Sequence, residues 1–184
     1  KIENNFILKD QIIKKELIHL YDTNLFFLDI TEIKKIFKKI DFIESYEIKK
    51  IYPNELKIKI FEKKPIAILH HNKKKFYISE NIDLMNYTDI ENYRDLPLVF
   101  GKKENFRILY RNLKKINFPL DLINKYYLYK SNRWDLETYQ KKTIKLPTKN
   151  YVKSLENFMS FRKQVNYNKY KIFDYRINNQ LILK

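Results

Sequence analysis

The chain has 184 residues, of which 44% are hydrophobic and 16% aromatic, and its charged residues give a net charge of +16. This composition excludes a disordered chain, which would contain fewer apolar and aromatic residues. The sequence contains no cysteine, so it has neither disulfides nor a thiolate nucleophile.

The positive charge alone does not indicate nucleic-acid binding. Only six of the 38 basic residues are arginine, whereas Lys, Ile, Asn and Tyr are abundant, as expected for a very A/T-rich genome. The lysines are interleaved with Glu and Asp, which is typical of solvated faces. We therefore expect no nucleic-acid partner, and a basic nucleic-acid-binding protein stays an alternative.

Residues 1–64 have the pattern of a small α+β unit. A strand is expected near residues 1–7, followed by a helix over residues 10–21, with Asp10 as a possible N-cap. A second helix follows, ending near Ile40. Asp29 with Glu32 three residues later resembles a capping box at the start of that helix. The unit is expected to end in two strands.

Those two strands meet at Tyr52-Pro53-Asn54-Glu55, which predicts a type I or II turn in a loop longer than two residues. Leu56, Ile58 and Ile60 alternate with lysines, so this strand has one buried face. Ile51 falls on the opposite face, which predicts a strand end or a bulge. Pro65 is expected to lie at the first residue of a strand or on an edge, because it lacks a ladder donor. It is also expected to be the joint between two units, which should abut because no Gly/Ser linker separates them.

Residues 65–184 are predicted to form a second, mainly antiparallel β domain with two helices. The helices are indicated by apolar residues at helical spacing over residues 106–116 and 152–162. The expected strands cover residues 66–70, 76–79, 122–130, 133–139, 143–146 and 169–184.

No pattern in the sequence indicates catalysis or a cofactor. Gly101 is the only glycine, which excludes a glycine-rich phosphate loop and a G-x-S-x-G nucleophile elbow. His70 and His71 are adjacent, so on a strand they point to opposite faces and do not form a metal site. We expect no enzyme, no metal and no cofactor.

Several short motifs, taken in order, resemble the extracytoplasmic part of the bacterial FtsQ/DivIB cell-division family, in which a POTRA domain precedes a β domain. They are Asn24-Leu25-Phe26, Ile43-Glu44, Tyr52-Pro53, "EKKPIA" at residues 62–67, "LPLVFG" at residues 96–101, "RWDLETYQKKTIKLP" at residues 133–147 and "FDYR" at residues 173–176. Each motif is weak alone, and the order makes the resemblance specific. It implies an α+β fold with a β-α-α-β-β POTRA domain at residues 1–64 and an FtsQ-type β domain at residues 65–184.

The resemblance also implies a cellular role. Members of the family are non-catalytic, single-pass proteins of the bacterial inner membrane, so a cytoplasmic tail and a transmembrane helix would precede Lys1. The segment would lie in the periplasm at the division septum. It would hold the divisome together by binding FtsB, itself paired with FtsL, through the last strands of the β domain. The POTRA domain would contact other division proteins.

The mechanism implied is β-augmentation, in which an edge strand pairs with a strand of the partner. Arg176 would be the charge partner of an acidic residue, and Trp134 would either contribute to the same face or pack in the core. The expected partner-binding residues are Arg133, Trp134, Tyr175, Arg176, Ile177, Asn179, Leu181 and Leu183. The alternative from the same fold is a POTRA module of an outer-membrane assembly or secretion system.

Overall fold

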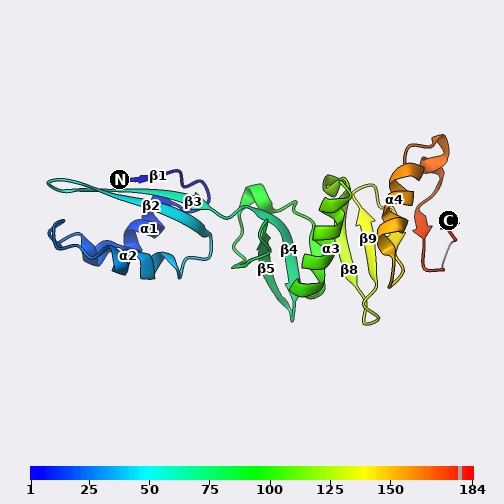
Figure 1. The fold of residues 1–184 in the computed structure, drawn as a ribbon, viewed down its shortest axis with the longest axis horizontal. Helices are drawn as coiled ribbons and strands as arrows, with labels where there is room; N and C mark the ends of the chain where they lie inside the picture. The colour runs from blue at the N-terminus through cyan, green and yellow to red at the C-terminus, as the bar shows by residue number, and fades with distance from the viewer. Residues whose placement is uncertain (178–179) are drawn as a thin grey trace.

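The computed structural model describes residues 1–177 and 180–184. Two units follow one another along the long axis, and the chain ends lie in different units (Figure 1). The first unit has a three-stranded sheet and the second a nine-stranded sheet.

The first unit consists of β1 (Ile2–Glu3), α1 (Asp10–Glu16), a 3₁₀ turn (Ile18–Leu20), α2 (Ile30–Phe37), β2 (Ile43–Ile51) and β3 (Glu55–Glu62). The sheet order is β1-β3-β2, with β1 parallel and β2 antiparallel to β3. Ile58 and Ile60 of β3 are buried between half-buried lysines, which confirms the predicted alternation.

The helix starts differ in part from the sequence prediction. Asp29 caps α2, because its carboxylate accepts the Thr31 N–H at 2.8 Å. Glu32 does not complete a capping box, since its side chain lies 3.0 Å from the His19 ring. The N-cap of α1 is Lys9 and not Asp10, and α1 ends at Glu16, before the predicted end of that helix.

Pro53 lies in the β2–β3 hairpin loop, and Pro65 lies at the joint between the two units. β2 ends at Ile51, as predicted, and residues 52–54 form the loop. The Tyr52–Pro53 peptide in this loop is cis. Pro65 is the first residue of its strand, as predicted. Glu62, just before the joint, accepts the N–H groups of Phe6, Ile7 and Leu8 and so fixes the chain that leads into α1.

The second unit contains β4 (Pro65–His71), β5 (Lys74–Ser79), β6 (Leu84–Asn86), β7 (Leu98–Phe100), α3 (Lys103–Lys115), β8 (Ile123–Leu128), β9 (Trp134–Thr138), β10 (Thr143–Lys145), α4 (Tyr151–Phe161), β11 (Ile172–Asp174) and β12 (Ile182–Leu183). Its 3₁₀ turns are Glu91–Tyr93, Leu120–Leu122 and Val165–Lys169. The sheet order is β12-β11-β10-β9-β8-β7-β4-β5-β6.

This sheet is mixed. The pairs β4–β7, β7–β8 and β10–β11 are parallel and the other neighbouring pairs are antiparallel. The sequence prediction missed the three-residue strands β6 and β7. It also read residues 169–184 as strand, where the structure has the end of a 3₁₀ turn and two short strands. The α+β fold class is confirmed.

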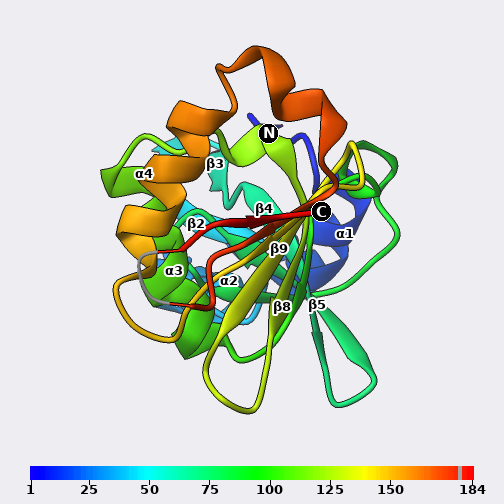
Figure 2. The ribbon, with the colours of Figure 1, turned by 90° about the vertical axis from the view of Figure 1, so that its right-hand side faces the viewer.

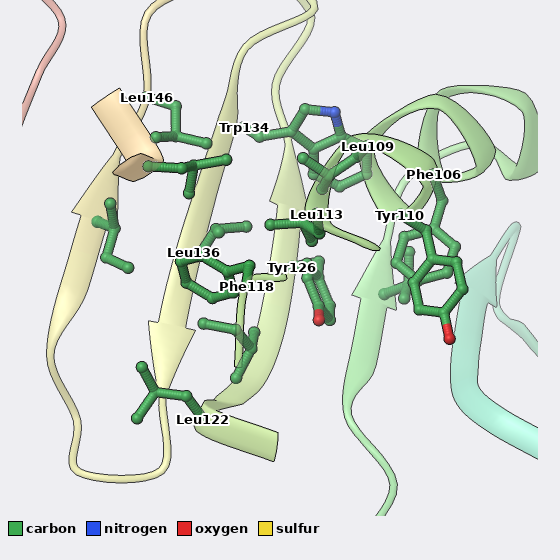
Figure 3. Close-up of a cluster of buried hydrophobic side chains, with 14 of the residues drawn as sticks. Phe106, Leu109, Tyr110, Leu113, Phe118, Leu122, Tyr126, Trp134, Leu136 and Leu146 are labelled. Carbon is green, nitrogen blue, oxygen red and sulfur yellow. The ribbon is translucent and has the colours of Figure 1, made fainter. Parts of the chain in front are cut away.

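Both helices of the second unit cover the same face of the sheet (Figure 2). Phe106, Leu109 and Leu113 of α3 pack against Tyr126 and Leu136 of the sheet (Figure 3). All are almost fully buried, and such burial contributes about 1.5–3 kcal/mol for each large apolar side chain. The face of the sheet opposite to the helices carries the charged residues described below.

The two units abut, as the absence of a linker predicts. Ile68, Tyr77 and Met85 of the second unit belong to the same apolar cluster as the core of the first unit. The Phe42 and Tyr77 rings lie 6.0 Å apart across the joint. Polar contacts surround this cluster: the Glu80 N–H donates to the Lys64 carbonyl, and Asn81 and Asn86 donate to Glu44 and Asp41.

Candidate partner-binding site

β12 forms one edge of the nine-stranded sheet. Lys184 exchanges two hydrogen bonds with Ile172, at 2.9 and 3.1 Å, and Ile182 is in register with Asp174. Because alternate residues of a strand direct their N–H and C=O groups to opposite sides, those of Leu183 point away from β11. Within the described residues no strand pairs with this side of β12. The edge therefore offers backbone donors and acceptors to another chain.

The side chains of β12 support this edge from the core. Leu183 and Leu181 are half-buried and pack against the apolar cluster beneath the helices. Ile182 is also half-buried, and alternation directs it to the opposite face of the sheet.

Asp174 and Arg176 form a close ion pair beside the edge. The Arg176 Nε and Nη2 donate to both carboxylate oxygens of Asp174, at 2.8 and 2.6 Å. These hydrogen bonds hold the pKa of Asp174 below its ordinary value of 3.8. The Asp174 side chain is only 7% exposed, whereas that of Arg176 is 47% exposed. Arg176 is thus accessible to a second carboxylate.

Arg133, the residue before β9, is held in a comparable way. Its Nη1 donates to Asp135 at 2.7 Å, and its guanidinium lies 4.3 Å from the centre of the Tyr129 ring. Burial raises the pKa of Asp135, and the charge of Arg133 opposes that shift. Lys145 of β10 is in register with Asp135 on one side and with Asp174 on the other. Asp135, Lys145 and Asp174 therefore form a charged row across three strands.

The sequence analysis missed Asp135, Lys145 and Asp174. The signal was present, because Arg133 and Asp135, like Asp174 and Arg176, are two residues apart and so lie on one face of an extended segment. Lys145 carries no comparable local signal, since only the sheet register brings it between the two carboxylates.

Trp134 and Tyr175 lie in the core. Trp134 is 5% exposed, because the alternation of β9 that directs Arg133 to the open face directs Trp134 to the helices. Its ring leaves no room for a side chain at Gly101, where a Cβ would lie 3.2 Å from the Trp134 Cη2 and 2.8 Å from the Leu128 Cβ. The Tyr175 hydroxyl donates to Asn157 at 3.0 Å, and burial raises the pKa of Tyr175. Both residues support the site from within.

Ile177 is the exposed apolar residue nearest to this edge in sequence. It is 51% exposed and lines a pocket of 510 Å³ between the C-terminal segment and α4, together with Lys153, Asn157 and Leu181. Asn179 lies outside the described residues.

The open side of β12 suits the docking of another chain. Within residues 1–177 and 180–184, no three His, Asp or Glu side chains are grouped as for a metal ion. His70 instead packs against the Phe100 ring at 5.0 Å, and burial lowers its pKa. No helix in the described part of the chain is long and apolar enough to cross a membrane.

The fold thus defines a POTRA-bearing protein with a β domain that ends in an open edge. The family model "POTRA domain, FtsQ-type" matches residues 1–63. The chain is 29% identical over 168 residues to the "Cell division protein FtsQ" of Rickettsia typhi, with 88% of this chain and 62% of that protein covered. It is 30% identical over 166 residues to the protein of the same name from Rickettsia prowazekii, with 87% and 61% covered. A third relative of that name, from Rickettsia bellii, is 28% identical over 167 residues, with 88% and 62% covered.

The chain is thus similar to proteins named cell division protein FtsQ, and its first 63 residues match the FtsQ-type POTRA model, in agreement with the resemblance that its motifs indicated. It spans 61–62% of the length of these relatives.

Proposed function

We propose that this chain is the extracytoplasmic part of a non-catalytic divisome scaffold that binds FtsB, paired with FtsL, at the β12 edge. The observation that carries the proposal is that no strand among the described residues pairs with the outer side of β12, in a chain whose first 63 residues match an FtsQ-type POTRA domain. The POTRA domain would contact other division proteins. A single transmembrane helix before Lys1 would anchor the protein in the inner membrane and leave the segment in the periplasm at the septum.

In this proposal the partner adds a strand to the sheet. Its backbone bonds to the outward N–H and C=O groups of Leu183, which supplies affinity with little sequence preference. β12 has only two residues in strand conformation, so the ladder is short and side chains must supply the rest. An acidic residue of the partner meets Arg176, and an apolar residue meets Ile177 at the mouth of the 510 Å³ pocket.

The test is retention of purified FtsB–FtsL by variants at fixed salt. Replacement of Arg176 by Glu should weaken retention at least about tenfold, because it reverses the charge that faces the partner. Removal of residues 177–184 should weaken it more, since the backbone ladder is lost with them.

Arg94→Glu is a matched control. Arg94 makes the same bidentate contact with Asp89, at 2.8 and 2.7 Å. It lies in the segment between β6 and β7, two strands that are far from β12 in the sheet order. The Arg94→Glu variant should retain FtsB–FtsL as the unaltered chain does. Undiminished retention by the truncated chain would refute strand pairing at this edge.

A further inference from the structure

The six arginines of this lysine-rich chain divide into two sets. Three of them bond an aspartate at 2.6–2.7 Å: Arg94 with Asp89, Arg133 with Asp135 and Arg176 with Asp174. The other three, Arg107, Arg111 and Arg162, lie on α3 and at the C-terminal end of α4, and within the described residues none of them forms an ion pair. The arginine guanidinium suits a carboxylate, and among the described residues no carboxylate lies within ion-pair distance of these three arginines.

The lysines of the helices show the same imbalance. Lys114, Lys115, Lys153 and Lys163 are exposed on or just after the two helices, which contain only two carboxylates, Glu104 and Glu156. Across the described part of the chain, every ion pair lies outside α3, α4 and the residues that follow them directly. The helices therefore present an unneutralised positive layer.

A groove of 1010 Å³ runs between α3 and α4 within this layer. Figure 2 shows the two helices side by side, and the Asn112 amide donates to the Tyr151 hydroxyl between them at 2.6 Å. The apolar residues of the groove are half-buried: Ile116, Val152 and Met159. Lys115 lines it from α3, and Arg162 with Lys163 line it where α4 ends; these three basic residues outnumber Glu156, the one carboxylate among the lining residues.

An exposed apolar residue extends the groove along α3. Ile108 is 58% exposed. Asn112 and Lys115, four and seven residues later, both line the groove, so helical spacing places Ile108 on the same stripe of α3. The combination of apolar lining and basic margins is the complement of a helix with one apolar and one acidic face.

We propose that the α3–α4 groove docks an acidic amphipathic helix of a protein partner. The apolar face of that helix covers Ile108 and Met159, and its carboxylates meet Lys115, Arg162 and Lys163. This surface lies on the helical side of the sheet, opposite to the charged row of Asp135, Lys145 and Asp174, so it adds a second docking site to the β12 edge.

The apolar component distinguishes this occupant from a phosphate polymer or a lipid surface. Nucleic acid and anionic lipid headgroups are bound through charge, and their affinity does not depend on an aliphatic side chain in a groove. The affinity of an amphipathic helix depends on both the charge and the apolar contact.

The probe is a fluorescent synthetic peptide with a helical repeat of Leu and Glu, and the readout is anisotropy at fixed salt with the whole chain. Arg162→Glu with Lys163→Glu should weaken binding at least about tenfold, which is about 1.4 kcal/mol. Ile108→Ser alters an exposed residue and leaves the charge of the chain unchanged. It should weaken binding about threefold.

The matched control is Lys34→Glu with Lys35→Glu. Lys34 and Lys35 are likewise two adjacent, exposed basic residues near the C-terminal end of a helix, α2, and their reversal should change affinity less than twofold. A peptide of Leu and Lys should in turn prefer the Arg162→Glu, Lys163→Glu variant.

Two results would overturn the proposal. One is an equal loss from the α2 control, which would mean that the peptide senses only net charge. The other is an unchanged affinity of Ile108→Ser, together with binding of duplex DNA or phosphatidylglycerol vesicles that the groove variant alone abolishes. FtsB–FtsL retention by the groove variant should stay normal, so failure here and failure of the β12 proposal are distinguishable.

Discussion

Asp174 and Asp135 occupy one face of the same sheet, yet their pKa values shift in opposite directions. Asp174 accepts hydrogen bonds from the Arg176 side chain, which favour its charged form. The pKa of Asp135 is raised mainly by burial, which disfavours the charged form in spite of the neighbouring Arg133. The ionised form of Asp174 therefore stabilises the fold, whereas ionisation of Asp135 costs stability.

These shifts predict opposite pH dependences for two Asn variants. The stability that Asp174 supplies is present above its unfolded pKa, near 3.8, and is lost as the pH falls through its lower folded value. Asp174→Asn should thus flatten the acid loss of stability below about pH 4. Asp135 binds its proton more readily in the folded state, because its pKa is raised there. Protonation of Asp135 on acidification therefore offsets part of the loss of stability. Asp135→Asn should steepen the loss above about pH 4.

Urea unfolding between pH 3 and pH 7 measures both effects, with the unaltered chain as reference. Equal pH slopes for the two variants would contradict the assignment. Arg176→Ala should cost on the order of 1–2 kcal/mol at neutral pH, less than a fully buried pair because the guanidinium is half-exposed.

At the scale of elements, the joint between the two units is held by more than the proline that sequence reasoning singles out. Pro65 begins β4, but the Phe42 ring against Tyr77 and the hydrogen bonds from Asn81 and Asn86 also cross the joint. Those contacts join residues that are 35 or more positions apart, so no local pattern predicts them. The same limit applies to β6 and β7, whose three residues each are too few for a period to be read.

Phe42→Ala should therefore loosen the joint more than Pro65→Ala. Loss of a large buried aromatic ring costs about 3–5 kcal/mol, whereas Pro65→Ala removes a φ restraint and restores an N–H. NMR relaxation of both units gives their separate tumbling times. We expect separate tumbling for Phe42→Ala and near-common tumbling for Pro65→Ala, and the reverse order would assign the joint to the proline.

At the scale of the molecule, the sequence predicts the larger features well. The apolar periods of the helices and the alternation of β3 suffice for the α+β class, and the ordered motifs suffice for the resemblance to FtsQ proteins. They do not predict which side chains gather at the β12 edge, because the charged row depends on the register of three strands. Trp134 and Tyr175 illustrate the same limit, since a motif gives their position in the sequence and only packing decides which way each ring points.

The arrangement along the long axis separates the first unit from the β12 edge (Figure 1). The POTRA unit lies at one end and the β12 edge at the other, so a partner on β12 leaves the first unit uncovered (Figure 1). The opposite edge strand of the large sheet, β6, lies beside the joint, where Asn86 donates to Asp41. One edge of the sheet is thus next to the first unit, and at the other edge no described strand pairs with the outer side of β12.

The most direct test of partner pairing at β12 is a site-specific disulfide cross-link to FtsB. The chain has no cysteine, so an introduced one reports a single position. With single cysteines scanned through the extracytoplasmic part of FtsB, Ile182→Cys should give a cross-linked species at a few alternate FtsB positions, as strand pairing requires. Leu84→Cys on β6, which is 37% exposed, should give none. FtsB that is retained but cross-links equally to both edges, or to Leu84→Cys alone, would contradict pairing at β12.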